Sequence, residues 1–315
     1  MTHVLAVTGP IYLLIALGWV AVRRGWFGAA DLRVFGRFMI TLCLPALVFD
    51  AISRRAAAEV LHAPFLVAYA AGSLAVLLGG VWWARRSGAS PAAAALQGMG
   101  MACPNSGYVG YPILLQVLGP VAGVVLALAM LVENLLTIPL ALAMAESGGQ
   151  ASRRAAVLQA LRSLARMPLL WSIVLGFAFA LLELRLPEPL ARTLGLLGTA
   201  STPLALFIIG GTLVGLKLDG GMRVDLLRVA LGKLVLHPLA VLLMVLILPP
   251  FDPALRTGVV LAAAMPMMSI YPVLAQRFGQ ERPCAAALLT ATVLSFVTIN
   301  LALVGLRLQP GWLPG

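Results

Sequence analysis

The amino-acid sequence predicts an all-α polytopic membrane protein of ten transmembrane helices, built as two inverted five-helix repeats. Three observations support this fold class. Hydrophobic residues make up 61% of the 315 positions and charged residues only 10%, whereas a soluble domain carries roughly 25% charged residues. Apolar runs of about 20 residues, long enough to span a bilayer as a helix, recur along the chain. The second half of the sequence also repeats features of the first.

The apolar runs define ten expected spans joined by short connections. They lie at residues 4–22, 32–52, 63–84, 91–118, 121–145, 167–184, 190–216, 224–248, 254–278 and 283–306. The first run lacks a basic leader and is followed by Arg23 and Arg24, so we interpret it as a retained helix and not as a cleaved signal peptide. The segment 153–167, "RRAAVLQALRSLARM", predicts an interfacial amphipathic helix between spans 5 and 6.

The basic residues sort by side of the membrane. Of the 22, fifteen follow odd-numbered spans and six lie in the opposite loops and termini. Because cytoplasmic loops carry the excess of Lys and Arg, we expect the odd-numbered loops to be cytoplasmic and both termini to lie on the non-cytoplasmic side of the plasma (inner) membrane. This sorting accounts for the net charge of +11 without a nucleic-acid partner.

Residues of spans 1, 2 and 4 recur in spans 6, 7 and 9. The pairs are Pro10/Pro168, Gly18/Gly176, Pro45/Pro203 and Phe49/Phe207, each 158 residues apart, and "YPILLQVLG" (Tyr111–Gly119) against "YPVLAQRFG" (Tyr271–Gly279), with five identities in nine. Five spans in each half force the second half to insert upside down relative to the first. The chain therefore divides into repeats at residues 1–150 and 151–315, an architecture common among secondary transporters.

The corresponding spans 4 and 9 each carry a cluster of helix-breaking residues: Pro104, Gly107, Gly110 and Pro112 in one, Pro266 and Pro272 in the other. A proline removes a backbone donor and clashes with the preceding turn, so each cluster is expected to open its span into two half-helices. Unwound backbone at membrane depth is tolerated only where it is buried in protein or lines a wet cavity. The alternative interpretation, an ordinary kink, is the one we retain for lone prolines such as Pro139 and Pro238.

If the two breaks cross near the midplane, their half-helix N-termini would favour an anion, because these ends present free N–H groups and a positive dipole end. The break is then a binding site. The candidate substrate-binding residues are Asn105, Ser106, Gly107, Tyr108, Pro112, Pro266, Met267, Ser269 and Pro272.

Charged residues within spans are costly and usually functional. Glu133, next to Asn134 in span 5, is the candidate proton-coupling carboxylate; the alternative is a carboxyl kept protonated by a hydrogen bond to a neighbouring helix. Lys233 in span 8 could balance Glu133 or an anionic substrate, or it could snorkel to the cytoplasmic interface. His237 shares the helix face of Lys233 and is either a proton relay or a packing residue.

Several segments resemble the auxin efflux carrier (AEC) family. "NSGYVGYP" (Asn105–Pro112) resembles the N-T-G-F-x-G-x-P signature of that family's fourth helix, and "AMPMMSIYPVLAQRFG" (Ala264–Gly279) its ninth-helix signature. The segments "GWVAVRRGWF", "LPALVF" and "TPLALFIIGGTL" are similar to its first, second and seventh helices. The chain departs from the family at Pro104, and at Met267 and Met268, where the family often has small residues and asparagine.

The resemblance implies ten helices, inverted repeats, and broken helices 4 and 9 that cross at a central site. It also implies a scaffold of helices 1, 2, 6 and 7 beside a mobile domain of helices 3–5 and 8–10. Family members move small organic anions, including auxin in plants and malonate or malate in bacteria. Because the chain lacks the long cytoplasmic loop of the plant PIN proteins, it is similar to the compact bacterial type. Asn105, Pro112 and Pro272 take the binding role by this carry-over.

The leading hypothesis is therefore a secondary active transporter of a small organic anion that works by alternating access. Transport is expected to be coupled to protons or to the membrane potential, with sodium as an alternative coupling ion. No cofactor is expected, and a homodimer is expected by resemblance. The alternatives are a sodium-coupled organic-anion symporter of the bile-acid-transporter-like fold and a passive channel. No Walker motif, H-E-x-x-H or G-x-S-x-G is present, and the three cysteines lie in apolar runs without metal-site spacing. An enzyme and a metal site are therefore not expected.

Overall fold

The computed structural model describes residues 2–55, 62–146, 168–214 and 223–307. Within these ranges it is nearly all helical, without a strand longer than an isolated bridge. Six helical stretches are long and apolar enough to cross a membrane: Ala29–Ser53, Ala63–Arg86, Ser106–Glu146, Glu188–Thr212, Asp225–Ile247 and Glu281–Leu306. Shorter apolar helices cover Tyr12–Arg23, Pro168–Leu181 and Pro253–Ala264. The protein is a multi-pass α-helical membrane protein; its ten-span inverted arrangement stays a prediction.

The chain folds into two compact units, each made of segments distant in sequence. Unit 1 comprises residues 1–62, 107–128 and 165–216, and unit 2 comprises residues 63–106, 129–164 and 217–315. The division falls inside two helical stretches, after Ser106 and after Leu128. The predicted amphipathic helix at 153–167 lies outside the described residues. The expectation of a scaffold and a mobile domain stays a prediction.

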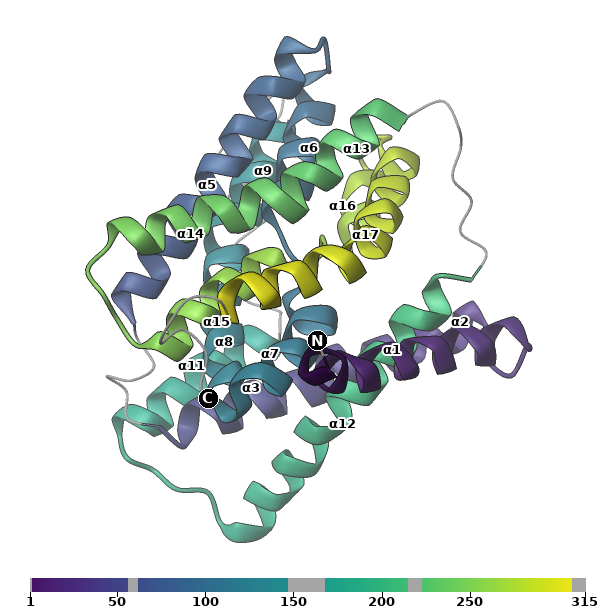
Figure 1. Cartoon of the computed structure of the whole chain (residues 1–315). Coiled ribbons are helices and arrows are strands. Elements are labelled where there is room, and N and C mark those ends of the chain that lie inside the picture. Colours follow the sequence, from purple (N-terminus) through teal and green to yellow (C-terminus); the bar gives the residue numbers. More distant parts are fainter. Residues whose placement is uncertain (1, 56–61, 147–167, 215–222, 308–315) are drawn as a thin grey trace. The chain divides into compact units, whose positions relative to one another are not determined.

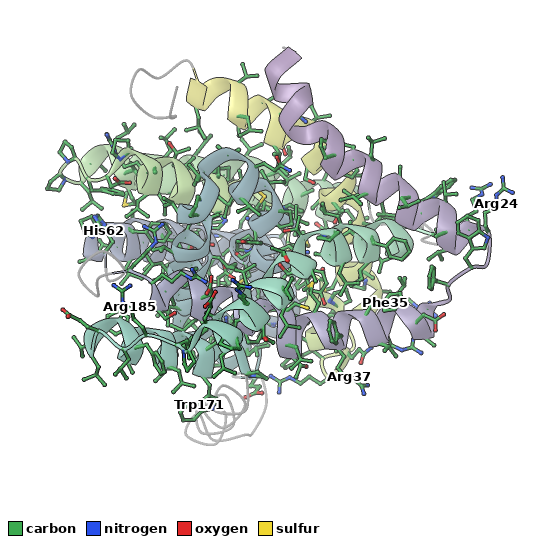
Figure 2. The ribbon with its side chains drawn as sticks, turned by 90° about the horizontal axis from the view of Figure 1, so that it is seen from below. Arg24, Phe35, Arg37, His62, Trp171 and Arg185 are labelled. Atoms are coloured by element: carbon green, nitrogen blue, oxygen red, sulfur yellow. The ribbon has the colours of Figure 1, made fainter. Side chains whose placement is uncertain are left out.

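Unit 1 packs helices from both halves of the chain (Figure 1). Its helices are α1 (Thr2–Arg23), α2 (Ala29–Phe38), the π-helical η1 (Met39–Cys43), α3 (Leu44–Ser53), α7 (Tyr111–Leu118), the 3₁₀ turn η3 (Gly119–Val121), most of α8 (Ala122–Val132), α11 (Pro168–Leu181) and α12 (Glu188–Thr212). The closest pairings are α1 with α12 and α3 with α11. Figure 2 shows Arg24 and Arg185, which follow α1 and α11, at well-separated edges of this unit.

Unit 2 contains α5 (Ala63–Arg86), α6 (Pro91–Ala102), the π-helical η4 (Glu133–Thr137), α9 (Ile138–Glu146), α13 (Arg223–Leu231), the π-helical η5 (Gly232–Leu236), α14 (His237–Ile247), α15 (Pro253–Ala264), α16 (Tyr271–Gln276) and α17 (Glu281–Arg307). In Figure 1, α5 crosses α14, with which it packs. A further π-helical segment, η2 (Ser106–Gly110), crosses from unit 2 into unit 1. The core of unit 2 buries side chains such as Leu77, Leu96, Met99 and Tyr271.

Among the described residues, the four π-helical segments share one sequence feature. Each ends two residues before a proline: Pro45, Pro112, Pro139 and Pro238. The proline ring would clash with the carbonyl four residues back. Widening to an i→i+5 bond relieves the clash, and the bonds Leu44 N–H to Met39 O, Ile138 N–H to Glu133 O and His237 N–H to Gly232 O have this spacing. Pro139 and Pro238 are therefore more than simple kinks, because their π turns contain Glu133 and Lys233.

Two repeat-related glycines of unit 1 make equivalent contacts. A Cβ on Gly18 of α1 would lie 2.1 Å from the carbonyl oxygen of Phe207 in α12, and one on Gly176 of α11 would lie 3.3 Å from that of Phe49 in α3. Gly176 stands 158 residues after Gly18, and Phe207 stands 158 residues after Phe49. Small residues let membrane helices approach closely. In both places a glycine lets two helices from different halves of the chain approach closely.

Gly210→Ala should loosen the pairing of α1 with α12. A Cβ at Gly210 would stand 1.8 Å from the backbone oxygen of Ile15, so the helices must separate, at a cost of about 1–3 kcal/mol. Thermal unfolding of the detergent-solubilised protein, followed by tryptophan fluorescence, measures this loss. The control is Gly195→Ala on the same helix, where nothing lies within 4 Å of the added Cβ; this variant should be at least as stable as the native protein. Equal stability of the two variants would contradict the close approach.

Candidate functional site

The two proline-containing helix breaks contact each other inside unit 2. Helix α6 ends at Ala102 and α15 ends at Ala264. Beyond these ends, Pro104 and Met267 form an antiparallel bridge. The amide N–H of Asn105 donates to Pro266 O at 2.6 Å, and that of Met268 donates to Cys103 O at 3.2 Å. The bonded residues, 103–105 and 266–268, are buried, so each break satisfies backbone groups of the other that lipid could not.

One pair of polar side chains joins the breaks as well. Asn105 Nδ2 donates to Ser269 Oγ at 2.7 Å; Asn105 is 6% exposed, whereas Ser269 is exposed. Asn105 and Ser269 are 164 residues apart.

The carboxyl of Glu133 is tied directly to the first break. Its Oε1 accepts the Ser106 hydroxyl at 2.5 Å and the Tyr69 hydroxyl at 2.7 Å. Glu133 is 4% exposed and Tyr69 is fully buried. A π turn that begins at Glu133 positions the carboxyl, and α5 supplies Tyr69. The hydroxyl pair gives a buried carboxyl the donors that it needs.

Lys233 and His237 form a second buried polar cluster of unit 2. Lys233 Nζ donates to Ala263 O at 2.6 Å and lies 2.8 Å from His237 Nδ1. His237 Nε2 lies 2.9 Å from Ser73 Oγ. All three side chains are 0% exposed, so the interpretation of Lys233 as a snorkelling residue is wrong. The rings of Tyr69 and His237 lie 5.9 Å apart and connect this cluster to the Glu133 cluster.

The predicted site residues divide between the two units. Unit 2 holds Asn105, Ser106, Pro266, Met267, Ser269 and Pro272 together with Glu133, Asn134 and Lys233; unit 1 holds Gly107, Tyr108 and Pro112. Tyr108 Oη lies 3.5 Å from Gly36 O, and a Cβ on Gly107 would press on Leu44. Asn134 does not bond to Glu133 but donates to Met130 O in its own helix.

Sequence reasoning missed Tyr69 and Ser73, two hydroxyl residues of α5. The available signal was their spacing: they lie four residues apart on one helix face, as do Lys233 and His237. In the described part of the chain, no three His, Cys, Asp or Glu side chains are grouped as metal ligands. The arrangement places a buried carboxyl and a buried amine beside the two joined helix breaks.

Unit 1 contains two surface hollows beside α3. One, of about 740 Å³, is lined by α3, α11 and the start of α12, with Arg54, Arg55 and Arg185 among its residues. The other, of about 450 Å³, lies between α3, α7 and α12 and includes Tyr111 and Thr199. Arg54 is already paired with Asp50 at 2.7 Å, and neither hollow contains a fully buried charged side chain. The buried cluster of unit 2 is therefore the better candidate.

Comparison with known proteins agrees with the motifs. Residues 3–303 match the family described as membrane transport protein. The chain belongs to this family. It is 31% identical over 309 residues to a protein of Rhizobium meliloti (strain 1021) named "Putative malonate transporter", covering 95% of both chains. It is 28% identical over 299 residues to "Uncharacterized transporter YfdV" of Escherichia coli (strain K12), covering 91% of this chain and 92% of the relative. The resemblance to the auxin efflux carrier family is confirmed, and this family member is a membrane transporter, not an enzyme.

Glu133→Ala should destabilise this transporter, whereas Glu133→Gln should be tolerated. Alanine leaves the buried hydroxyls of Tyr69 and Ser106 without their acceptor, at a cost of about 2–4 kcal/mol; glutamine keeps an acceptor oxygen. Thermal unfolding in detergent measures both variants. The control is Glu188→Ala, which removes an exposed carboxylate paired with Arg192 and should change the stability by less than about 1 kcal/mol. If Glu133→Ala is as stable as Glu133→Gln, the two hydroxyl bonds do not hold the carboxyl.

Proposed function

We propose that the protein is a secondary active transporter of a small organic anion, a mono- or dicarboxylate of the malonate or malate kind. The observation that carries the proposal is the pair of joined helix breaks, with Asn105, Ser106 and Ser269 at the junction and Glu133 bonded to it. Family membership and the malonate transporter named among the relatives support the substrate class. Carriers built from broken helices bind substrate at such junctions.

In this proposal the substrate binds at the junction with Asn105 as the main side-chain donor. Ser106 and Ser269 flank it, and Pro266 and Met267 shape the second break. The remaining predicted residues, Gly107, Tyr108, Pro112 and Pro272, belong to the same two sequence motifs. Free N–H groups where a helix restarts favour the negative charge of a carboxylate.

Glu133 is the proposed proton-coupling group. As a carboxylate it accepts both hydroxyl protons, whereas a protonated carboxyl has one O–H to donate and fewer acceptor sites. Its proton therefore changes the bond to Ser106, the neighbour of Asn105. Substrate binding and proton binding are linked through this one hydrogen bond. Asn134 supports the π turn of Glu133 through Met130 O and has only an indirect role.

The remaining parts of the mechanism follow the family. We propose alternating access, with helices 3–5 and 8–10 moving against a scaffold of helices 1, 2, 6 and 7. We further propose insertion in the plasma (inner) membrane with both termini on the non-cytoplasmic side, because the basic residues sort that way. A homodimer is the proposed assembly.

Asn105→Ala should strongly reduce substrate uptake without unfolding the protein. The backbone bonds of the junction remain in the variant, but the side-chain donor is lost, so uptake should fall about 10- to 100-fold. The measurement is uptake of labelled malonate, malate and indole-acetate into proteoliposomes, with saturation and counterflow to separate a carrier from a channel. Asn300→Ala is the control, because that amide donates to Phe296 O in its own helix.

The outcomes separate the site from the function. If no anion enters with the native protein under a pH gradient or a sodium gradient, the organic-anion assignment falls. If uptake is saturable and Asn105→Ala transports normally, the function holds and the binding site lies elsewhere.

Glu133→Gln should uncouple transport from the proton gradient. Glutamine resembles the protonated carboxyl but cannot release a proton, so an acidic outside should no longer accelerate uptake. Exchange of internal for external malonate, which needs no net proton movement, should persist. The matched control is Glu188→Gln at an exposed position. Gradient-stimulated uptake in Glu133→Gln equal to that of the native protein would remove Glu133 from the coupling step.

A further inference from the structure

Lys233 places an amine inside the membrane-spanning part of unit 2. It is one of two lysines in the chain, is 0% exposed and lies in the π turn η5. A buried charge persists only when paired and hydrogen-bonded. The hydrogen-bond partners of Lys233 therefore indicate the role of its amine.

The first partner is the end of a broken helix. Ala263 is the last residue but one of α15, and the second break follows at Pro266. The last carbonyls of a helix have no partner in their own helix and carry the negative end of the helix dipole. Lys233 Nζ donates to Ala263 O at 2.6 Å. The ammonium thus lies at a carbonyl end where a cation is stabilised.

The second partner fixes the position of the ammonium. His237 Nδ1 lies 2.8 Å from Lys233 Nζ, and Nε2 lies 2.9 Å from Ser73 Oγ. If Nδ1 accepts from the ammonium, Nε2 carries the proton and donates to Ser73. Ser73 and His237 are 164 residues apart, as are Asn105 and Ser269. Both bonded pairs therefore join the first half of the chain to the second.

Other titratable groups lie around the Lys233 amine. Glu133 and the Cys103 thiol are within electrostatic reach of the amine. Tyr69 links the clusters, since its hydroxyl donates to Glu133 and its ring lies against His237. Unit 2 thus encloses one amine and one carboxyl in a connected polar cluster.

We propose that Lys233 is a tethered cation, which occupies at the carbonyl end of α15 the kind of position that sodium takes in carriers with broken helices. Transport is then independent of sodium. This inference rests on the proposed transport function, and it selects the proton over sodium as the coupling ion. The site is a monovalent-cation site filled by the protein's own side chain.

Removal of the ammonium should open a site that a small external cation can fill. Lys233→Ala should unfold about 5 °C lower than the native protein. Methylammonium chloride should restore part of that loss relative to choline chloride at equal ionic strength. Lys233→Met, which fills the space without charge, should be destabilised and not restored. Arg192→Met, which removes an exposed cation, should unfold like the native protein.

Two results of this unfolding assay would overturn the proposal that Lys233 is a tethered cation. One is a Lys233→Ala variant that methylammonium does not stabilise. The other is a Lys233→Met variant as stable as the native protein. Neither result depends on the substrate, so this assay decides the inference even if no tested anion is transported.

The native protein provides a second test that needs no variant. Uptake of malonate driven by a pH gradient should be the same in sodium and in choline media. Stimulation of uptake by sodium would overturn the inference while leaving the organic-anion function intact. Absence of uptake of every anion in every medium would remove the proposed function alone, and the unfolding assay would still decide the role of Lys233.

Discussion

The structure depends on the rule that backbone polar groups inside a membrane protein must find partners within the protein. Prolines end α6 and α15 in the middle of apolar segments and leave amides and carbonyls unsatisfied. Two backbone bonds, from Asn105 to Pro266 and from Met268 to Cys103, satisfy them by joining the breaks. The same bonds bring residues more than 160 positions apart into one place, and so create the candidate site.

The rule extends from the backbone to the side chains. The carbonyl of Ala263, near the end of α15, is satisfied by Lys233, and the carboxyl of Glu133 is satisfied by two hydroxyls. Prolines position both charged groups, because the π turns before Pro139 and Pro238 contain them. Prolines therefore act in two ways. Pro104 and Pro266 follow the ends of α6 and α15, whereas Pro139 and Pro238 follow the π turns that contain the charged groups. Hydrogen-bond partners for these groups are expected, because each unsatisfied buried polar group costs several kcal/mol.

Contacts between the two halves of the chain occur in both units. In unit 1, Gly18 meets Phe207 and Gly176 meets Phe49, and in unit 2, Ser73 bonds to His237 as Asn105 bonds to Ser269. The glycine contacts join α1 to α12 and α11 to α3, and the bond between Ser73 and His237 joins α5 to α14. Residues from both halves of the chain thus pack within each unit, while the inverted repeat itself stays a prediction.

The sequence by itself determined the membrane class, the helical stretches, the places of the two breaks and the presence of Glu133 and Lys233 among apolar residues. Composition and proline chemistry act locally, so they can be interpreted without a fold. Only the tertiary structure decided the hydrogen-bond partners of these residues.

A buried serine can bond to its own helix, as Ser172 does to Leu169 O, or to a distant carboxyl, as Ser106 does to Glu133. Likewise, a lysine two turns from a helix end can extend to the interface or turn inward, and Lys233 turns inward because the end of α15 and His237 lie there. Which choice is made depends on which helix packs against that face, and this information is distributed over the whole fold.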